Sequence, residues 1–256
     1  FPVRTAMSGP AAGAVGAVHT ARAVTRPNVV TLDMGGTSAD VALIRNYDAG
    51  VSFDREVAGF PVRLPMVEIH SVGAGGGSIA WFDRDGLLKV GPDSAGAEPG
   101  PACYGRGGPL TVTDMNLFLG KIPARRFPFS LDRQVVTQKL SELAERMVDE
   151  PDRQSMTPEQ LAAGFLQIAN ANMVRAIRKV SIAKGYDPRE HVLVTFGGAG
   201  GQHACAIARS LEIQTILHHP FSGILSAMGI GMARCGDQAL RGPSGGPPGA
   251  LRGPSG

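Results

Sequence analysis

The sequence predicts an α/β fold in which a mixed β-sheet is flanked by helices, with a loop-rich β insertion at about residues 50–113. Three observations lead to this prediction. Two apolar runs flank a glycine turn at residues 29–44, which is typical of a strand hairpin. A continuous apolar run at residues 192–196 enters a second glycine turn and an Ala-rich helix, as buried strands do. Helical periodicity dominates residues 113–185.

The composition indicates a globular domain with a proper hydrophobic core. The chain has 256 residues, of which 43% are hydrophobic and 18% are charged, and this balance argues against disorder. Its net charge of +3 is small and scattered, so we expect no nucleic-acid partner. No apolar run approaches the roughly 20 residues that span a bilayer, so we expect no membrane segment.

The two ends of the chain and its three cysteines lead to further predictions. The first residues lack an initiating Met and the layout of a signal peptide, so we expect a piece cut from a longer chain. Cys103, Cys205 and Cys235 are an odd number without C-x-x-C spacing, which favours a reducing cytoplasm over a disulfide scaffold or a zinc knuckle. The string ALRGPSG occurs twice near the end, and we expect residues 236–256 to form a Gly/Pro-rich disordered tail.

The stretch from Val29 to Ile44 holds the densest group of chemically useful side chains. One apolar run ends at Asp33, and the next begins at Asp40. Glycines between them let the backbone turn sharply and bring an anion close to bare N–H groups. Carboxylates suit the cation of a metal-chelated phosphate or its waters. We therefore expect a phosphate at this turn, held by Gly35, Gly36, Thr37 and Ser38; the alternative is a plain structural hairpin.

Helices are expected on both sides of the strand regions. A turn at residues 8–10 precedes an Ala-rich helix, which either brings its N-terminal amides near the phosphate or packs through its small residues. Thr113 and Asp114 are expected to cap a short helix. Helical spacing predicts a further helix over residues 131–149 and a long one that starts at residue 157 and stops at Gly185.

Two glycine-rich loops accompany the short strands expected at residues 51–90: one interrupts these strands, and the other follows them. The loop at residues 73–78 fits neither a Rossmann nor a P-loop pattern, and its glycine density indicates that its backbone approaches another group closely. The connection at residues 91–113 is long enough that we expect it to form a site or to be pinned by one. Cys103 within it is expected to be a buried structural thiol, with a nucleophile or metal ligand as the alternatives.

A second glycine turn follows the apolar run at residues 192–196. A strand that passes through a glycine turn into a helix N-terminus is suited to hold a phosphate or the edge of a nucleotide. The alternative is a close packing turn between strand and helix. The glycines concerned are Gly197, Gly198, Gly200 and Gly201. Another strand is expected at residues 215–219, followed by a loop that enters a final helix.

Six strings in this order carry a resemblance: SGPAAG, LDMGGTSAD, HSVGAGGGSIA, VGPDSAGAEPGPACYGRGG, TVTDMNLFLG and FGGAGGQHACAIA. From about Ser8 to Ala233 the chain resembles the hydantoinase A / 5-oxoprolinase family of the actin-like ATPase superfamily. The resemblance implies a ribonuclease-H-like lobe that binds ATP against another such lobe. Only the second-lobe motif is present, so we expect residues 1–235 to be a partial hydantoinase A-type ATPase domain without its first lobe.

The resemblance also assigns roles to the two glycine turns. It implies that Asp33 and Asp40 hold Mg²⁺ or its waters and act in catalysis, while the first turn holds the β- and γ-phosphates of ATP. It implies that the second turn contacts the nucleoside side of ATP, with Arg175 and Arg178 as further candidates along the adenosine. Ala39 stands where the family usually has Thr, which removes one hydroxyl beside the phosphates.

The implied reaction is ATP-dependent hydrolysis of a cyclic amide such as 5-oxoproline, as in glutathione metabolism, or a hydantoin. Phosphorylation of the lactam carbonyl makes its oxygen a leaving group, and a hydantoinase B-type subunit or domain completes the hydrolysis. Two alternatives are an ATP-binding subunit of an acetone- or acetophenone-type carboxylase and an inactive truncated fragment. The exposed face left by a missing lobe favours an oligomer.

Finer features of the motif loops point in more than one direction. Residues 201–206 look like the 5-oxoprolinase branch of the family, whereas residues 70–73 look like the hydantoinase branch. His70, Cys103 and His203 also lie in these loops, and imidazole and thiolate suit zinc. Their sequence separation does not itself support a shared metal site.

Overall fold

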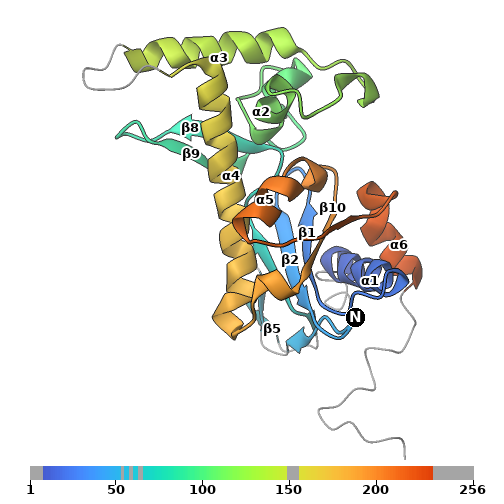
Figure 1. Cartoon of the computed structure of the whole chain (residues 1–256). Coiled ribbons are helices and arrows are strands. Elements are labelled where there is room, and N and C mark those ends of the chain that lie inside the picture. Colours follow the sequence, from blue (N-terminus) through green and yellow to red (C-terminus); the bar gives the residue numbers. More distant parts are fainter. Residues whose placement is uncertain (1–7, 53–54, 58–59, 63–65, 149–155, 233–256) are drawn as a thin grey trace, which may run out of the picture.

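A computed structural model describes residues 8–52, 55–57, 60–62, 66–148 and 156–232. The predicted tail at residues 236–256 lies outside these ranges, as does Cys235. The described residues form a central sheet with helices on both faces, and a second group of helices and a hairpin lies beyond one end of the sheet (Figure 1).

The central sheet has five strands in the order β11-β10-β1-β2-β7. Strand β10 runs parallel to β1 and β11, whereas β2 runs antiparallel to β1 and β7. All residues of β10 are buried, as expected of an apolar strand covered on both faces. The predicted mixed sheet is therefore confirmed. Its strands are β1 (Val29–Met34), β2 (Ala39–Ile44), β7 (Ile69–Val72), β10 (Val192–Phe196) and β11 (Ile216–His218).

Alternate residues of the central strands face two different helical layers. Val29 and Phe196 pack with helices α1 and α6 on one face. Leu32 and Leu193 join a larger core that includes residues of α4 and α5 on the other face. Because side chains alternate along a strand, Asp33 belongs to the face covered by α1 and α6. These helices are α1 (Ser8–Ala23), α4 (Pro158–Val180), α5 (Ala204–Ser210) and α6 (Leu225–Met232).

Helices α1 and α6 pack against each other through small residues. A Cβ atom on Gly229 of α6 would lie 1.8 Å from the carbonyl oxygen of Ala12 in α1, so no larger residue fits there. Helix α1 already begins at Ser8, so the predicted turn at residues 8–10 is wrong. Proline is tolerated in the first turn of a helix because its missing N–H has no partner there in any case.

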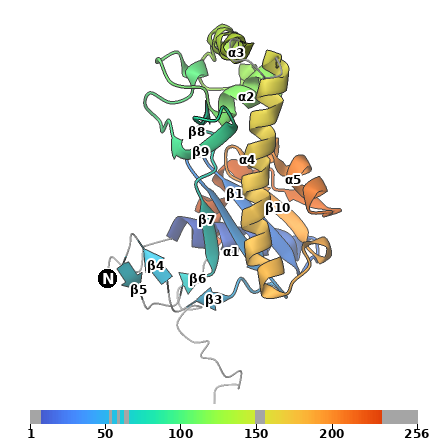
Figure 2. The ribbon, with the colours of Figure 1, turned by 90° about the vertical axis from the view of Figure 1, so that its left-hand side faces the viewer.

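The second group of elements contains a hairpin and two helices. Strands β8 (Ser78–Phe82) and β9 (Leu88–Ser94) pair antiparallel, and helices α2 (Val112–Phe118) and α3 (Arg133–Val148) follow. The helix predicted over residues 131–149 is thus confirmed. Helix α4 passes along both groups and joins them (Figure 2). Four very short strands lie near the other end of the sheet: β3 (Val51–Ser52), β4 (Arg55–Val57), β5 (Phe60–Val62) and β6 (Met66–Val67).

The long connection before α2 is pinned by Asp114, as the length of that connection predicts. This fully buried carboxylate accepts the N–H groups of Ala102, Cys103 and Thr111 and the Thr111 hydroxyl, at distances of 2.7–3.1 Å. The N-cap of α2 is Thr111, so the predicted cap at Thr113 and Asp114 is wrong. Asp114 is instead the third helical residue of a capping box, where its carboxylate bonds back to the cap.

Candidate functional site

Two carboxylates stand side by side at one end of the sheet. Asp33 of β1 and Asp40 of β2 are direct partners in the antiparallel ladder, so their side chains share one face. Burial raises the pKa of Asp33, the hydrogen bond from Ser226 opposes this rise, and the charge of Asp40 adds to it. Two negative charges on neighbouring strand positions repel each other unless a cation or a hydrogen-bond donor offsets the repulsion. The pair is therefore suited to a cation.

Each of these carboxylates accepts one hydrogen bond from a serine. Ser226 Oγ of α6 donates to Asp33 Oδ2 at 3.2 Å, and Ser71 Oγ of β7 donates to Asp40 Oδ1. Sequence reasoning missed both serines. Only the register of β2 with β7 and the packing of α6 bring them here, and neither is visible in a local pattern. The sequence signal for Ser71 was limited to its place in the string HSVGAGGG.

The first glycine turn presents backbone N–H groups to solvent. Gly35 N–H donates to the carbonyl oxygen of Ser38 at 3.0 Å, which closes the turn between β1 and β2. Gly36 and Thr37 are exposed, and their N–H groups have no acceptor among the residues that the structure describes. Nothing lies within 4 Å of the place where a Cβ of Gly36 would be. This turn can therefore offer amide and hydroxyl donors to an anion.

The dense glycine loop lies against this first turn. The N–H groups of Gly76 and Gly77 donate to the carbonyl oxygens of Gly35 and Gly36 at 3.0 and 2.6 Å. A Cβ atom on Gly75 would lie 2.5 Å from the carbonyl oxygen of Gly36. The close backbone approach that the glycine density predicts is therefore made to the first turn itself. Neither Gly35 nor Gly36 has a positive φ, so this turn does not depend on left-handed glycine.

The second glycine turn lies against the end of β1. Gly197 has φ +79°, and a Cβ atom there would lie 2.4 Å from the carbonyl oxygen of Met34 and 2.5 Å from Asp33 Oδ1. The N–H of Ala199 donates to the same Met34 oxygen at 2.9 Å. Gly198 faces open space. The structure thus brings both predicted turns together at the carboxyl ends of β1 and β10, where open α/β sheets bind ligands.

The remaining two glycines of the second turn differ in the space around them. Gly200 and Gly201 lie in the short 3₁₀ helix η6 (Gly200–Gln202). A Cβ atom would lie 2.6 Å from the Thr195 hydroxyl at Gly200, and 3.4 Å from the His218 ring at Gly201. The packing alternative therefore describes Gly200, which is buried, whereas Gly198 and Gly201 are exposed and leave room in front of the backbone.

The three side chains considered for zinc are not brought together. His203 is fully buried, with Nδ1 bonded to Asn170 Oδ1 at 2.7 Å and Nε2 bonded to Asn116 Nδ2 at 3.0 Å. Burial, with a smaller contribution from Lys121, lowers the pKa of His203 to about 4, so the ring is neutral. Burial also raises the pKa of the Cys103 thiol. Among the described residues no three His, Cys, Asp or Glu side chains could hold a metal ion together.

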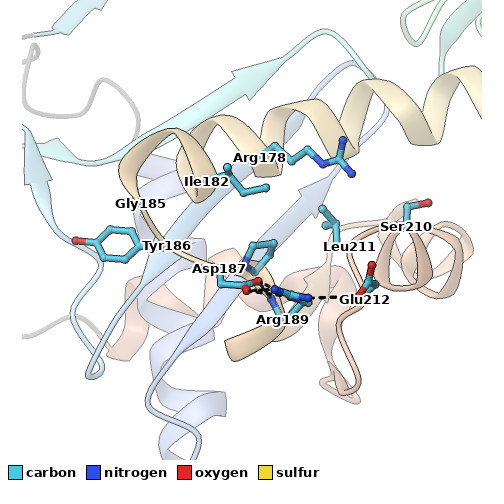
Figure 3. A pocket seen from close by; sticks show the side chains of 10 residues that line it. Arg178, Ile182, Gly185, Tyr186, Asp187, Arg189, Ser210, Leu211 and Glu212 are labelled. Carbon is cyan, nitrogen blue, oxygen red and sulfur yellow. Dashed lines mark hydrogen bonds and ion pairs between the residues drawn. The ribbon is translucent and has the colours of Figure 1, made fainter.

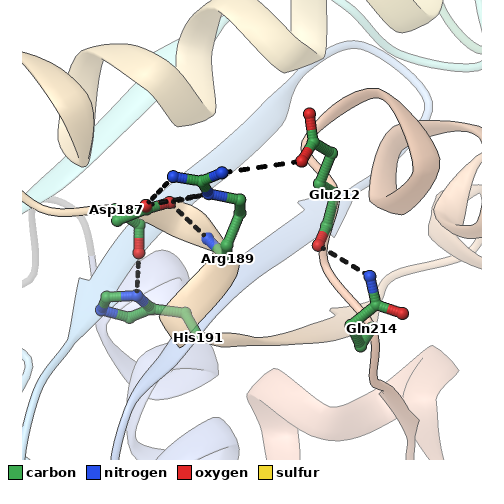
Figure 4. A network of polar contacts seen from close by, with 5 residues as sticks. All are labelled: Asp187, Arg189, His191, Glu212 and Gln214. Carbon is green, nitrogen blue, oxygen red and sulfur yellow. Dashed lines mark hydrogen bonds and ion pairs between the residues drawn. The ribbon is translucent and has the colours of Figure 1, made fainter.

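Of the two arginines considered for adenosine, Arg178 lies away from the glycine turns. Arg178 lines a cavity of about 400 Å³ between the end of α4, the turn before β10 and the end of α5 (Figure 3). This cavity is at the amino ends of β10 and β11, opposite the ends that carry the glycine turns. Beside it, Arg189 forms an ion pair with Asp187 at 2.7 Å (Figure 4). Arg175 bonds to Asn172 at 3.0 Å on its own helix.

The fold and the site together define a class of protein. It is an α/β lobe whose glycine turns and paired carboxylates meet at the carboxyl ends of adjacent parallel strands. More narrowly, the chain belongs to the hydantoinase/oxoprolinase family, because the family model described as Hydantoinase/oxoprolinase matches residues 1–239. The resemblance in the sequence motifs is therefore confirmed, as is the predicted α/β fold with a mixed sheet flanked by helices. The ribonuclease-H-like character of the lobe and the extent of the β insertion stay predictions.

Several curated relatives cover nearly the whole of this chain. The 5-oxoprolinase PfmaA of Pestalotiopsis fici is 47% identical over 238 residues, covering 89% of this chain and 18% of that protein. The 5-oxoprolinase of Saccharomyces cerevisiae is 43% identical over 243 residues, covering 90% of this chain and 18% of that protein. The caprolactamase subunit alpha of Pseudomonas jessenii is 38% identical over 227 residues, with 87% and 32% covered. The chain therefore spans about a fifth of the 5-oxoprolinases and a third of the caprolactamase subunit.

Two solved structures have closely similar folds. The ATP-dependent caprolactamase from Pseudomonas jessenii matches with a TM-score of 0.77 and 38% identity, covering 86% of this chain and 32% of that chain. A nucleotide-free acetone carboxylase matches with a TM-score of 0.76 and 29% identity, with 86% and 31% covered. Across the described part of the chain, no helix is long and apolar enough to cross a membrane.

Proposed function

We propose that this chain supplies part of the ATP site of an enzyme that hydrolyses a cyclic amide of the 5-oxoproline or hydantoin type. The observation that carries the proposal is the meeting of two glycine turns around the Asp33–Asp40 pair. Turns with bare N–H groups bind phosphate oxygens, and carboxylates hold the cation that accompanies them. The similarity to an ATP-dependent caprolactamase supports ATP as the phosphate-bearing ligand.

In this proposal the two turns bind different parts of the nucleotide. The first turn holds the β- and γ-phosphates through the N–H groups of Gly36 and Thr37 and the hydroxyls of Thr37 and Ser38. The second turn contacts the nucleoside side, where Gly198 leaves open space in front of the backbone. Gly197 and Gly200 keep the backbone of that turn close to the sheet, and the exposed Gly201 contributes to the nucleotide contact.

Asp33 and Asp40 fit a Mg²⁺ ion that arrives with ATP. Magnesium in nucleotide sites is held by one or two carboxylates, several waters and the phosphates. Asp33 Oδ1 and Asp40 Oδ2 accept no hydrogen bond from the residues that the structure describes, so both remain for the ion or its waters. When bound, the ion neutralises charge on the transferring phosphoryl group. The contribution of this chain is to hold the two carboxylates in place.

The proposed chemistry explains why an enzyme that hydrolyses such a cyclic amide would need ATP. Amide resonance makes the lactam carbonyl a poor electrophile, and transfer of the γ-phosphoryl group to its oxygen turns that oxygen into a leaving group. Water then attacks the carbon and the ring opens. The residues of this chain take no covalent part. They bind and orient the nucleotide, which is the main task of a protein in phosphoryl transfer.

The relatives favour a lactam as the substrate. The 5-oxoprolinases are 43% and 47% identical to this chain and the caprolactamase subunit is 38% identical, whereas the acetone carboxylase is 29% identical. An ATP-binding subunit of a carboxylase that phosphorylates a ketone enolate or bicarbonate is the second candidate, because the fold similarity to acetone carboxylase is equally high.

A partner and a location belong to the same proposal. One relative is named as a subunit alpha, which supports a hydantoinase B-type subunit or domain that completes the hydrolysis. Cys103 and Cys205 are both free, which supports a reducing, cytoplasmic setting.

The proposal is tested by measuring phosphate release from ATP with and without the flanking regions of a full-length relative. We expect Mg²⁺-dependent release that 5-oxoproline or a hydantoin stimulates, and loss of that release in the Asp33→Asn variant. Stimulation by a ketone and bicarbonate, but by no lactam, would favour the carboxylase. Release only when the flanking regions are present would identify the isolated chain as an inactive nucleotide-binding piece. No release under either condition would contradict the proposal.

A further inference from the structure

Two serines lie outside both glycine turns yet contact the candidate cation site. We propose that Ser71 and Ser226 are positioning residues that orient Asp40 and Asp33 for the metal ion. Ser71 Oγ donates to Asp40 Oδ1, and Ser226 Oγ donates to Asp33 Oδ2 at 3.2 Å. The inference rests on the proposed function and extends it to two serines to which the sequence analysis assigned no role.

Ser71, Asp40 and Asp33 lie in one row across the sheet, and Ser226 reaches this row from α6. Ser71 is the direct partner of Asp40 in the ladder between β2 and β7. Asp40 is the direct partner of Asp33 in the ladder between β1 and β2. Ser226 reaches Asp33 from α6, which covers this face of the sheet. Each carboxylate therefore lies beside the other and accepts a hydrogen bond from one serine hydroxyl.

Each serine occupies one carboxylate oxygen and leaves the other one open. A hydroxyl that donates to a carboxylate fixes the plane of that carboxylate. It also offsets part of the repulsion between Asp33 and Asp40, since it stabilises the charged form. Asp33 Oδ1 and Asp40 Oδ2 remain for the ion or its waters. Removal of such a supporting partner typically weakens metal binding by about 10–100-fold.

Ser226 is held in place by the packing of its helix. A Cβ on Gly229 would lie 1.8 Å from the Ala12 carbonyl oxygen, and a Cβ on Gly16 would lie 2.9 Å from the Leu225 carbonyl oxygen. The backbones of α1 and α6 are therefore in direct contact at two points. This contact fixes the second residue of α6, Ser226, relative to the sheet that α1 covers. The hydroxyl is thus set in position before any metal binds.

The test measures Mn²⁺ binding to the 256-residue chain by electron paramagnetic resonance, in the presence of a non-hydrolysable ATP analogue. We expect Ser71→Ala and Ser226→Ala each to weaken Mn²⁺ binding by about tenfold. Ser71→Thr keeps the hydroxyl and is expected to restore the affinity. Ser210→Ala is the matched control, because Ser210 Oγ donates to the carbonyl oxygen of Ala206 within α5 and contacts neither carboxylate.

The outcomes separate this inference from the proposed function. Equal Mn²⁺ affinity in the original chain and in both alanine variants would overturn the inference and leave the ATP site intact. An Mn²⁺ affinity of Ser71→Thr as low as that of Ser71→Ala would overturn it for Ser71, because the loss would then come from packing. If the original chain binds neither the ATP analogue nor Mn²⁺, the result contradicts the proposed function, and the inference is then wrong as well.

Discussion

Gly75 lies so close to Gly36 that a Cβ atom on Gly75 would be 2.5 Å from the Gly36 carbonyl oxygen. The dense glycine loop and the first glycine turn are therefore in backbone contact, although they are distant in the sequence. The hydrogen bonds from Gly76 and Gly77 to the same turn hold this contact. The shape of the candidate phosphate site is thus set by two segments of the chain rather than by the hairpin alone.

Replacement of Gly75 by Ala is expected to lower the free energy of unfolding by about 1–3 kcal/mol, because the methyl group forces two backbones apart. Gly36→Ala is the matched control in the facing segment. Since its Cβ would meet nothing within 4 Å, we expect a change within about 0.5 kcal/mol. Chemical denaturation of both variants measures the difference. Equal losses of stability in Gly75→Ala and Gly36→Ala would show that the glycine loop and the first turn are not in close backbone contact.

Gly197→Ala is expected to cost about 2 kcal/mol or more in unfolding free energy, because it combines φ +79° with a contact of 2.4 Å to the Met34 carbonyl oxygen. Gly198→Ala is expected to leave stability unchanged, because it faces open space. Under the proposed function, Gly198→Ala nevertheless weakens nucleotide binding, since its added methyl group occupies that space. Denaturation and nucleotide titration are measured on both variants. A Gly197→Ala chain as stable as the original would contradict the described turn.

Stability is expected to fall as the pH is lowered from about 6.5 to about 4. The pKa of His203 is lowered to about 4 in the folded chain, chiefly by burial, whereas an unfolded histidine has a pKa of about 6.5. Between these values the unfolded chain binds a proton that the folded chain does not, so acid favours unfolding. The full effect is about 3 kcal/mol.

Urea denaturation at a series of pH values measures this dependence on His203. His203→Asn is expected to be less stable at neutral pH but to lose most of the slope between about pH 6.5 and pH 4. His19→Asn, which changes an exposed histidine on α1, should keep the slope. A slope that persists in His203→Asn would assign the acid sensitivity to another group.

Asp33→Asn is expected to raise stability at pH 7 while it removes metal-dependent nucleotide binding. The pKa of Asp33 is raised in the folded chain, chiefly by burial, so its ionised form is less favourable there than in the unfolded chain. The destabilising effect is absent below the unfolded pKa of Asp and grows as the pH rises through the folded pKa.

Thermal unfolding at pH 7 and Mn²⁺ titration test this expectation for Asp33. Asp93→Asn, which changes an exposed carboxylate, is the control and should alter neither stability nor metal binding. A less stable Asp33→Asn chain would indicate that the carboxylate supports the fold rather than a ligand.

The local elements of this fold could be predicted because each has its own pattern of residues. The hairpin at residues 29–44 and the strand at residues 192–196 follow from continuous apolar runs, and the helix at residues 131–149 follows from apolar periodicity. The serines beside Asp33 and Asp40 could not be predicted, because they depend on strand register and helix packing. The cap at Thr111 was missed for a related reason, since Asp114 satisfies a distant loop as well as its own helix.

The proposed ATP site is tested most directly by calorimetric titration of this chain with a non-hydrolysable ATP analogue and Mg²⁺. The comparison is between the original sequence and a variant that carries both Asp33→Asn and Asp40→Asn. We predict binding of one nucleotide per chain that requires Mg²⁺ and is lost in the double variant. Equal binding by the two chains, or no binding by the original chain, would contradict a nucleotide site between the two glycine turns.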